Sequence, residues 1–236
     1  MTALRHIVEP ERLLLTWQPV DEKNPMRTRR LVGVVVRRIN GQFGFRYTSE
    51  LDDYKAAVAA GFQGFPAFKQ QETEITQGVL EALLRRLPPR KREDFPQYLA
   101  SHKLPSPFPA SDFALLGYTR ARLPSDGFEL VPVFSPDVVP CDLFIELAGT
   151  RHVDADLSAV ALGDTVTFEV DPENPVDQDS ILALHQGRRL GYINRALKEV
   201  FHQWLGRWDV RGTVERLNGK PERPLVFIRV EVRALP

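Results

Sequence analysis

The sequence is poor in the residues that build disulfides and metal centres. Its 236 residues include one cysteine, Cys141, so no disulfide can form within the chain. The five histidines are scattered, and no pair of cysteine or histidine residues has the spacing of a zinc site. These absences exclude a disulfide-stabilised fold, and we expect a protein with no metal and no cofactor.

The chain also lacks long apolar runs. No stretch approaches the ~20 consecutive apolar residues that a membrane-spanning helix needs. The opening segment, MTALRHIVEPERLLLTW, has too short an apolar run for a secretory signal and no small-residue cleavage site. We therefore expect a cytoplasmic protein without a membrane partner.

An excess of charge is absent as well. The chain has 31 basic and 31 acidic residues, and its formal net charge is +0. This excludes a uniformly basic surface that would attract nucleic acid over the whole molecule. The charges of the second half are nevertheless segregated, with ten acidic residues and one basic residue between 142 and 179, and eleven basic and five acidic residues between 188 and 233. Basic residues that share one face would form a local track for phosphates, and the alternative is a solvated surface of mixed charge.

What the chain contains is a composition typical of globular proteins, with 43% hydrophobic and 26% charged residues. Its length allows one large domain or two domains of roughly 100 residues each. The proline-rich stretch VPVFSPDVVPCD, at 131–142, is typical of a linker. We therefore predict two domains, residues 1–135 and 136–236.

The first domain is predicted to be α+β. Residues 30–36, RLVGVVV, predict a strand, and Asn40-Gly41 predicts a tight turn into a second strand at 44–47. Helices are expected at 49–61, 75–89, 91–102 and 112–119, followed by a strand at 127–134. The aromatic loop GFQGFPAF, at 61–68, either fills the hydrophobic core or faces a partner.

The second domain is predicted to be mainly β. Short β-rich segments lie at 142–149, 164–170, 180–185, 189–193, 210–217 and 224–232, and one helix is expected at 194–206. Many short strands with a single inserted helix indicate a small β-barrel or sandwich.

Residues 164–195 carry the most specific pattern in the chain. A strand leads into Asn174-Pro175-Val176-Asp177, an apolar strand follows at 181–184, and then come Gly191-Tyr192-Ile193 and Arg195. Upstream lies the segment Gly149-Thr150-Arg151-His152. In the order and spacing of these pieces, residues 141–236 resemble the HIRAN domain family.

The resemblance implies a small OB-like β-barrel. In eukaryotic helicase-like remodelling enzymes this module captures the 3′ end of single-stranded DNA, and family members also occur as bacterial proteins without the helicase. It therefore implies a non-enzymatic protein whose partner is single-stranded DNA, bound at a 3′-hydroxyl end. The candidate binding residues are Arg151, His152, Asn174, Asp177, Tyr192, Arg195 and Lys198.

A carboxylate in such a site suits a free 3′ end, which carries a hydroxyl and no phosphate. Asp177 would accept a hydrogen bond from that hydroxyl and would reject a 3′-phosphate by repulsion. Arg151, Arg195 and Lys198 would hold the neighbouring phosphates.

Base stacking is the remaining contribution expected of the site. Tyr192 and His152 would stack on bases, at ~1–3 kcal/mol for each stacked base. The sequence departs from the family pattern at Val176, where the family usually has an aromatic residue, because valine cannot stack. Asp179 stands where the family often has asparagine and adds a second negative charge.

Each of these residues also has a plainer role open to it. Asn174 with Pro175 would set a turn without any ligand, and Asp177 would accept hydrogen bonds from the backbone of its own loop. Tyr192 would be a core residue of the second domain, Arg195 would begin a helix, and His152 would be ordinary surface.

The first domain has a resemblance of its own. The order of a strand with Val32-Gly33, the segment FGFRY at 43–47, the helix at 75–89, DFALLGYT at 112–119 and DGFELVP at 126–132 is similar to the N-terminal subdomain of HipA-type toxin kinases. The kinase body and its motifs are missing here. The resemblance over residues 30–135 therefore implies a scaffold or a surface for a protein partner rather than phosphotransfer.

No set of nucleophile, base and orienting residue is found that would indicate an enzyme. The carboxylates of 154–158, DADLS, and of 171–179 would allow a metal-dependent nuclease, although their spacing matches no known metal motif. Two alternatives to nucleic-acid binding therefore stay open, a protein-interaction module of a toxin–antitoxin or defence system and, more weakly, a nuclease.

Overall fold

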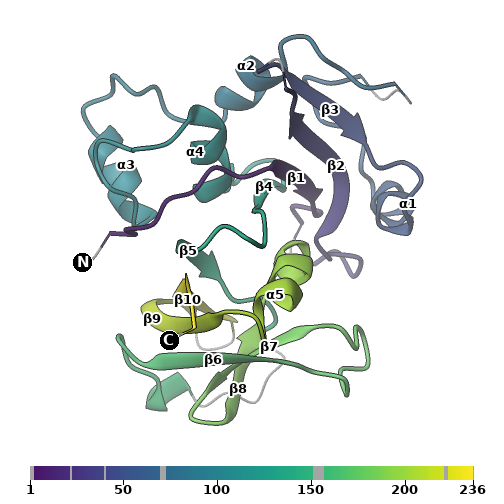
Figure 1. Cartoon of the computed structure of the whole chain (residues 1–236). Coiled ribbons are helices and arrows are strands. Elements are labelled where there is room, and N and C mark those ends of the chain that lie inside the picture. Colours follow the sequence, from purple (N-terminus) through teal and green to yellow (C-terminus); the bar gives the residue numbers. More distant parts are fainter. Residues whose placement is uncertain are drawn as a thin grey trace. The chain divides into compact units, whose positions relative to one another are not determined.

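The computed structural model describes residues 3–21, 23–39, 41–69, 73–150, 157–220 and 223–235. The protein is mostly β, with two antiparallel sheets and few, short helices (Figure 1). The chain divides into an N-terminal unit, Glu9–His102 with Ser106–Phe134, and a C-terminal unit, Met1–Val8 with Lys103–Pro105 and Ser135–Pro236. The domains 1–135 and 136–236 stay a prediction, and the observed units differ from them because two N-terminal segments pack with the C-terminal half.

The N-terminal unit is built on a four-stranded antiparallel sheet with the order β3-β2-β1-β4. Its strands are β1 (Arg12–Trp17), β2 (Arg30–Arg37), β3 (Phe43–Tyr47) and β4 (Phe128–Val133), and its helices are α1 (Asp52–Ala59), α2 (Val79–Leu84), α3 (Phe95–Ser101) and α4 (Asp112–Tyr118). Helix α1 packs against β2, and α4 packs against β4 (Figure 1).

The predicted strands and helices of this unit are confirmed, but the helices are shorter than predicted. The helix expected over 75–89 begins only at Val79, after Gly78 in the left-handed conformation with φ +65°. Upstream of it, Ile75 pairs with Phe45 of β3 through two backbone hydrogen bonds. The central strand β1 was not predicted at all.

The aromatic loop at 61–68 belongs to the core of the N-terminal unit. Phe62, Phe65 and Phe68 are each at most 5% exposed. The Tyr47 hydroxyl donates a hydrogen bond to the Phe68 carbonyl (2.7 Å) and accepts one from the Phe65 N–H (3.0 Å). The core interpretation of this loop is therefore confirmed over the partner-facing one.

The proline-rich stretch at 131–142 is predicted to be a linker, but both of its ends belong to strands. Its first three residues complete β4, and Cys141 already begins β5 (Cys141–Glu146). Pro132 lies within β4 opposite Leu13 of β1. Proline is tolerated there because β4 is an edge strand in the sheet order and its lost N–H breaks no central ladder.

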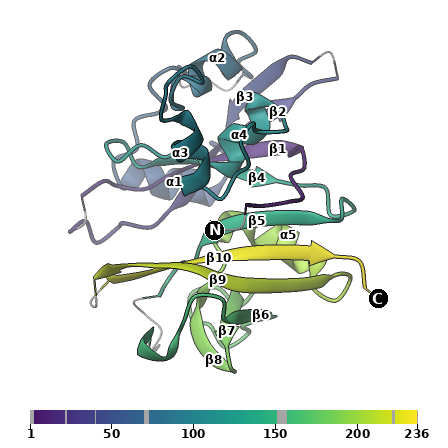
Figure 2. The same ribbon diagram turned by 90° about the vertical axis from the view of Figure 1, so that its left-hand side faces the viewer.

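The C-terminal unit is built on a six-stranded sheet with the order β5-β10-β9-β6-β7-β8. Its further elements are β6 (Thr165–Val170), β7 (Ile181–His185), β8 (Arg188–Tyr192), α5 (Lys198–Trp204), β9 (Asp209–Lys220), β10 (Arg223–Arg233) and two 3₁₀ turns, Leu157–Ala159 and Arg195–Leu197. Strands β5, β10 and β9 run side by side (Figure 2), and α5 packs against β7. The six predicted strands and the helix are confirmed, with ends that differ by a few residues.

The two ends of this sheet meet at one point. Ala148, just beyond β5, and Tyr192, the last residue of β8, exchange backbone hydrogen bonds of 2.7 and 2.8 Å. Gly191 permits this approach, because a Cβ there would lie 3.0 Å from the Ala148 carbonyl oxygen. In the part of the chain that the structure describes, the strands themselves do not pair into a closed barrel, so the predicted barrel is seen only as a six-stranded sheet with bridged ends.

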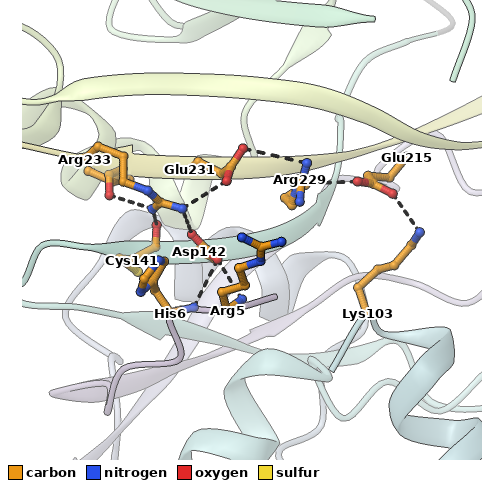
Figure 3. Close-up of polar contacts among 10 residues, drawn as sticks. Arg5, His6, Lys103, Cys141, Asp142, Glu215, Arg229, Glu231 and Arg233 are labelled. Atoms are coloured by element: carbon orange, nitrogen blue, oxygen red, sulfur yellow. Dashed lines mark hydrogen bonds and ion pairs between the residues drawn. The ribbon is translucent and has the colours of Figure 1, made fainter. Parts of the chain in front are cut away.

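Asp142 attaches the N-terminal segment to the C-terminal unit (Figure 3). Its carboxylate is 2% exposed and accepts hydrogen bonds from the backbone N–H groups of Arg5 (2.8 Å) and His6 (3.1 Å). It also pairs with Arg233 of β10 at 2.6 Å, and the Asp142 N–H donates to the His6 carbonyl. The start of the chain is therefore bonded to the edge strand β5.

Ion pairs of alternating sign continue from this point across the sheet (Figure 3). Arg233 pairs with Glu231 (3.0 Å), and Arg229 lies between Glu231 (3.8 Å) and Glu215 (3.4 Å). Glu215 in turn pairs with Lys103 at 2.7 Å, and Lys103 is 6% exposed. The network fixes Lys103–Pro105 to β9 and β10.

We expect Asp142→Asn to lower the free energy of unfolding of the C-terminal unit by ~2–4 kcal/mol, because two backbone donors and Arg233 lose a buried charged acceptor. Urea unfolding followed by circular dichroism and tryptophan fluorescence at pH 7 measures this change. The control is Asp137→Asn, which removes an exposed ion pair with Arg207 and should cost less than ~1 kcal/mol. Equally small losses in both variants would contradict the role given to Asp142.

Candidate nucleic-acid interface

The 171–180 loop, between β6 and β7, is shaped by its own hydrogen bonds. The Asn174 side-chain oxygen accepts from the backbone N–H groups of Val176 (2.9 Å) and Asp177 (3.2 Å). The Ser180 N–H donates to the Asp177 carbonyl, and the Asp171 N–H donates to the Ser180 carbonyl. Asn174 therefore sets a turn, as the plainer interpretation of this residue predicts.

Asp177 and Lys198 form the central ion pair of the site. The Lys198 ammonium, on the first residue of α5, donates to both Asp177 carboxylate oxygens, at 2.8 and 2.9 Å. Both side chains are 23% exposed. The Asp179 N–H also donates to Asp177 Oδ1 at 3.2 Å. A charged acceptor and a charged donor thus lie side by side at a partly exposed position.

The Asp177 carboxylate is ionised at neutral pH. Burial alone raises its pKa, but the hydrogen bond and charge of Lys198, the Asp179 N–H and the charge of Arg195 act against burial and hold the pKa below its ordinary value. An ionised carboxylate only accepts hydrogen bonds. A ligand atom that approaches Asp177 must therefore be a donor.

Tyr192 is anchored between β8 and the loop. Its hydroxyl donates to Oδ2 of Asp171 at 2.9 Å, and Asp171 is 4% exposed. A Cβ on Gly149, which has φ +68°, would lie 3.2 Å from the Tyr192 ring, so the ring packs directly on that backbone. Burial, followed by the hydrogen bond and charge of Asp171, raises the pKa of Tyr192, and the hydroxyl stays a donor.

Of the seven candidate residues predicted from the sequence, the structure describes five and joins them. Asn174 accepts a hydrogen bond from the Asp177 backbone N–H and acts to lower the pKa of Tyr192 against the larger effect of burial, and Asp177 pairs with Lys198. Arg195 begins the 3₁₀ turn before α5, and its charge acts on Asp177. Arg151 and His152 lie outside the described residues.

Three further residues were missed in the sequence. Asp171 holds Tyr192, as described above, and Arg189 approaches Asp171 at 3.6 Å. The His202 ring nitrogen Nε2 lies 2.7 Å from the Asp179 carbonyl oxygen. Lys198 and His202 are four residues apart on α5 and so share one helix face, a spacing that could have indicated their common contact with the loop.

Val176 lies at the tip of the loop and is 91% exposed. The side chain that departs from the family pattern therefore makes almost no contact with the protein. A larger side chain has room at this position.

The alternative of a metal-dependent nuclease gains no support from the described residues. Among them, no three His, Cys, Asp or Glu side chains are grouped so that they could hold a metal ion. Asp154 and Asp156, part of that interpretation, lie outside the described residues. The helices that the structure describes are also too short or too polar for any of them to cross a bilayer.

The lowered pKa of Asp177 predicts a pH-dependent contribution to stability. A carboxyl whose pKa is lower in the folded protein than in the unfolded chain stabilises the fold above the unfolded pKa, and the stabilisation is lost as the pH falls through the folded pKa. Since an ordinary aspartate has a pKa of ~3.9, wild type and Asp177→Asn should differ by a constant free energy of unfolding above about pH 5. The difference should disappear as the pH is lowered below about 4.

Urea unfolding at a series of pH values measures this difference. Asp52→Asn is the control, because the Asp52 side chain is 100% exposed and should show little pH-dependent difference. A difference for Asp177→Asn that grows on acidification would contradict the ion pair with Lys198.

Comparisons with known proteins do not assign the chain to a family. No protein-family model matches it, and no curated protein matches it. Among solved structures, the HIRAN domain of human HLTF matches with 19% identity and a TM-score of 0.31, over 39% of this chain and 74% of that domain. A protein from Lactobacillus plantarum matches with 25% identity and a TM-score of 0.31, over 39% of this chain and 95% of that protein.

These TM-scores are too low to establish a shared fold, so the function of this chain has to be argued from its own residues. The comparisons give no support to the HipA-like interpretation of residues 30–135. The resemblance to the HIRAN family is supported only to the extent that a HIRAN domain is among the similar structures.

Proposed function

We propose that the C-terminal unit binds single-stranded nucleic acid and takes a DNA strand at its 3′-hydroxyl end. The proposed site consists of the 171–180 loop, the end of β8 and the start of α5. The role is binding without a chemical step.

The Asp177–Lys198 ion pair is the observation that carries this proposal. A terminal nucleotide with a free 3′ end offers a hydroxyl, which is a donor, and a phosphate on its 5′ side, which is an anion. Asp177 accepts from the first and repels an added 3′-phosphate, and Lys198 attracts the second. Both side chains are 23% exposed and so within reach of a ligand.

Two further cations belong to the proposed site. Arg195 lies close enough to lower the pKa of Asp177, and Arg189 is 52% exposed beside Asp171. These positions suit a short run of phosphates rather than a long one, which agrees with the absence of net charge.

The proposed fold of the unit is an OB-like, partly open barrel. The bridge between Ala148 and Tyr192, which joins the two ends of the six-stranded order, supports this interpretation. OB-folds bind single strands on one face of such a barrel. The proposed site lies next to the bridge, because Tyr192 belongs to both.

The hydrogen bonds that Asp177 already makes within the protein support a role in binding rather than in catalysis. Its carboxylate accepts hydrogen bonds from the Lys198 ammonium and the Asp179 backbone N–H, and among the described residues no Ser, Thr or Cys side chain hydrogen-bonds it. A carboxylate in this state is an acceptor for a ligand rather than a general base.

Fluorescence anisotropy with a labelled 12-nucleotide strand tests the proposal. The strand is offered with a 3′-hydroxyl or with a 3′-phosphate, and a duplex and an RNA strand of the same sequence are compared. We expect the 3′-hydroxyl strand to bind ~10-fold more tightly than the 3′-phosphate strand. Asp177→Asn should bring this ratio close to one.

Salt dependence separates phosphate contacts from other binding. With two phosphates engaged, log K should fall with log salt with a slope of ~−1.4. Asp52→Asn, in the N-terminal unit, is the control and should leave the binding unchanged. Equal affinity for both ends, salt-insensitive binding or no binding at all would contradict the proposal.

Val176→Tyr should strengthen binding of the 3′-hydroxyl strand, because it adds a stacking ring at an exposed position beside the pair. A gain of ~1–3 kcal/mol per stacked base corresponds to a ~5- to 150-fold lower Kd. The matched control is Leu162→Tyr, since Leu162 is also an exposed aliphatic residue of this unit, at 66%. If the two variants bind alike, the loop tip does not face the nucleic acid.

A further inference from the structure

The way in which Lys198 holds Asp177 has a consequence for selectivity at the proposed site. A carboxylate offers about four lone-pair positions. Three of them are used inside the protein, two by the Lys198 ammonium and one by the Asp179 N–H. One acceptor position is therefore left for a ligand hydroxyl.

The same ammonium also changes what the site repels. It donates to both Asp177 oxygens, and Asp179 Oδ2, at 3.9 Å, is too far away for a further hydrogen bond. An anion placed next to Asp177 therefore meets a negative charge that is already paired. The anion can also replace the Asp177 carboxylate as the partner of Lys198, so that one ion pair is exchanged for another.

We propose that Lys198 sets how strongly the site distinguishes a 3′-hydroxyl from a 3′-phosphate. Because its ammonium pairs with both oxygens of Asp177, Lys198 weakens the discrimination against a 3′-phosphate. It also strengthens binding of either strand through the phosphate on the 5′ side. This inference rests on the proposed function and adds the residue that regulates its selectivity.

Removing the ammonium should therefore have two effects, a loss of affinity for both strands and a sharper distinction between the two ends. In Lys198→Met, both strands bind more weakly, because one phosphate contact is lost. The 3′-phosphate strand should lose far more than the 3′-hydroxyl strand, because Asp177 then presents an unpaired negative charge and two further free acceptor positions. We expect the ratio of the two Kd values to rise by about fivefold or more.

The experiment measures both Kd values by anisotropy for wild type, Lys198→Met, Lys198→Arg and Lys55→Met. Lys198→Arg keeps the charge and should leave the ratio within about twofold of wild type. Lys55→Met is the matched control, because Lys55 also pairs with an aspartate, Asp52, but in the N-terminal unit, and it should change neither Kd. The fold of each variant is checked by circular dichroism.

A double variant isolates the interaction between the two residues. In the Asp177→Asn background there is no carboxylate charge at position 177 for Lys198 to neutralise, so adding Lys198→Met should lower both affinities and raise their ratio far less than it does in the wild-type background. If Lys198→Met alone lowers both affinities equally, Lys198 is only a phosphate contact and the inference is overturned.

A titration without nucleic acid distinguishes failure of this inference from failure of the proposed function. In carboxyl NMR, the pKa of Asp177 should be higher in Lys198→Met than in wild type, because the cation that stabilises the charged form is gone. An unchanged pKa overturns the inference whatever the strands do. If the pKa rises but no strand binds to wild type, the ion pair is real and the proposed function is wrong, and the selectivity role falls with it.

Discussion

Two backbone hydrogen bonds between Ala148 and Tyr192 decide where the candidate interface forms. They join the two ends of the six-stranded order, and they hold the end of β8 against the chain that leaves β5. Because Tyr192 is fixed there, its hydroxyl reaches Asp171 at the start of the 171–180 loop. The internal turns of that loop then place Asp177 against α5. Backbone pairing therefore sets the position of the site, and the charged side chains then form their contacts within it.

The segregated charges of the sequence become partners in the folded C-terminal unit. Acids from the segment before residue 180 pair with bases from the segment after residue 187, as in Asp142 with Arg233 and Asp177 with Lys198. Because these bases are paired with carboxylates, they do not form a continuous track of unpaired positive charge. What distinguishes Asp177 from Asp142 is exposure, since the first pair is partly open to solvent and the second carboxylate is buried. The Asp177–Lys198 pair therefore contributes to stability, as the Asp142 pair does, but unlike the Asp142 carboxylate it is accessible to solvent.

Most elements of the fold could be predicted from local patterns, and the failures have identifiable causes. Periodicity and turn residues placed the strands of both units, but β1 was missed because its burial depends on strands that lie far away in the sequence. The start of α2 was placed too early because pairing of Ile75 with Phe45 overrides its helical spacing. In the site, the order of residues predicted that Asn174, Asp177 and Tyr192 belong to one group, and their role as a binding site stays a prediction. Their partners, above all Asp171 for Tyr192, are set by tertiary approach, for which a single sequence carries no direct signal.

The attachment of the N-terminal segment through Asp142 affects the order in which the two units can fold during synthesis. Arg5 and Asp142 are 137 positions apart in the chain, and at synthesis rates of ~5–20 residues per second the second is made roughly 7–30 s after the first. During that interval the segment before Glu9 has none of its partners on β5, while the residues of β1, β2 and β3 are already available to one another. The C-terminal unit is consequently completed after the N-terminal unit, although Arg5 and His6, which precede β1 in the chain, belong to it.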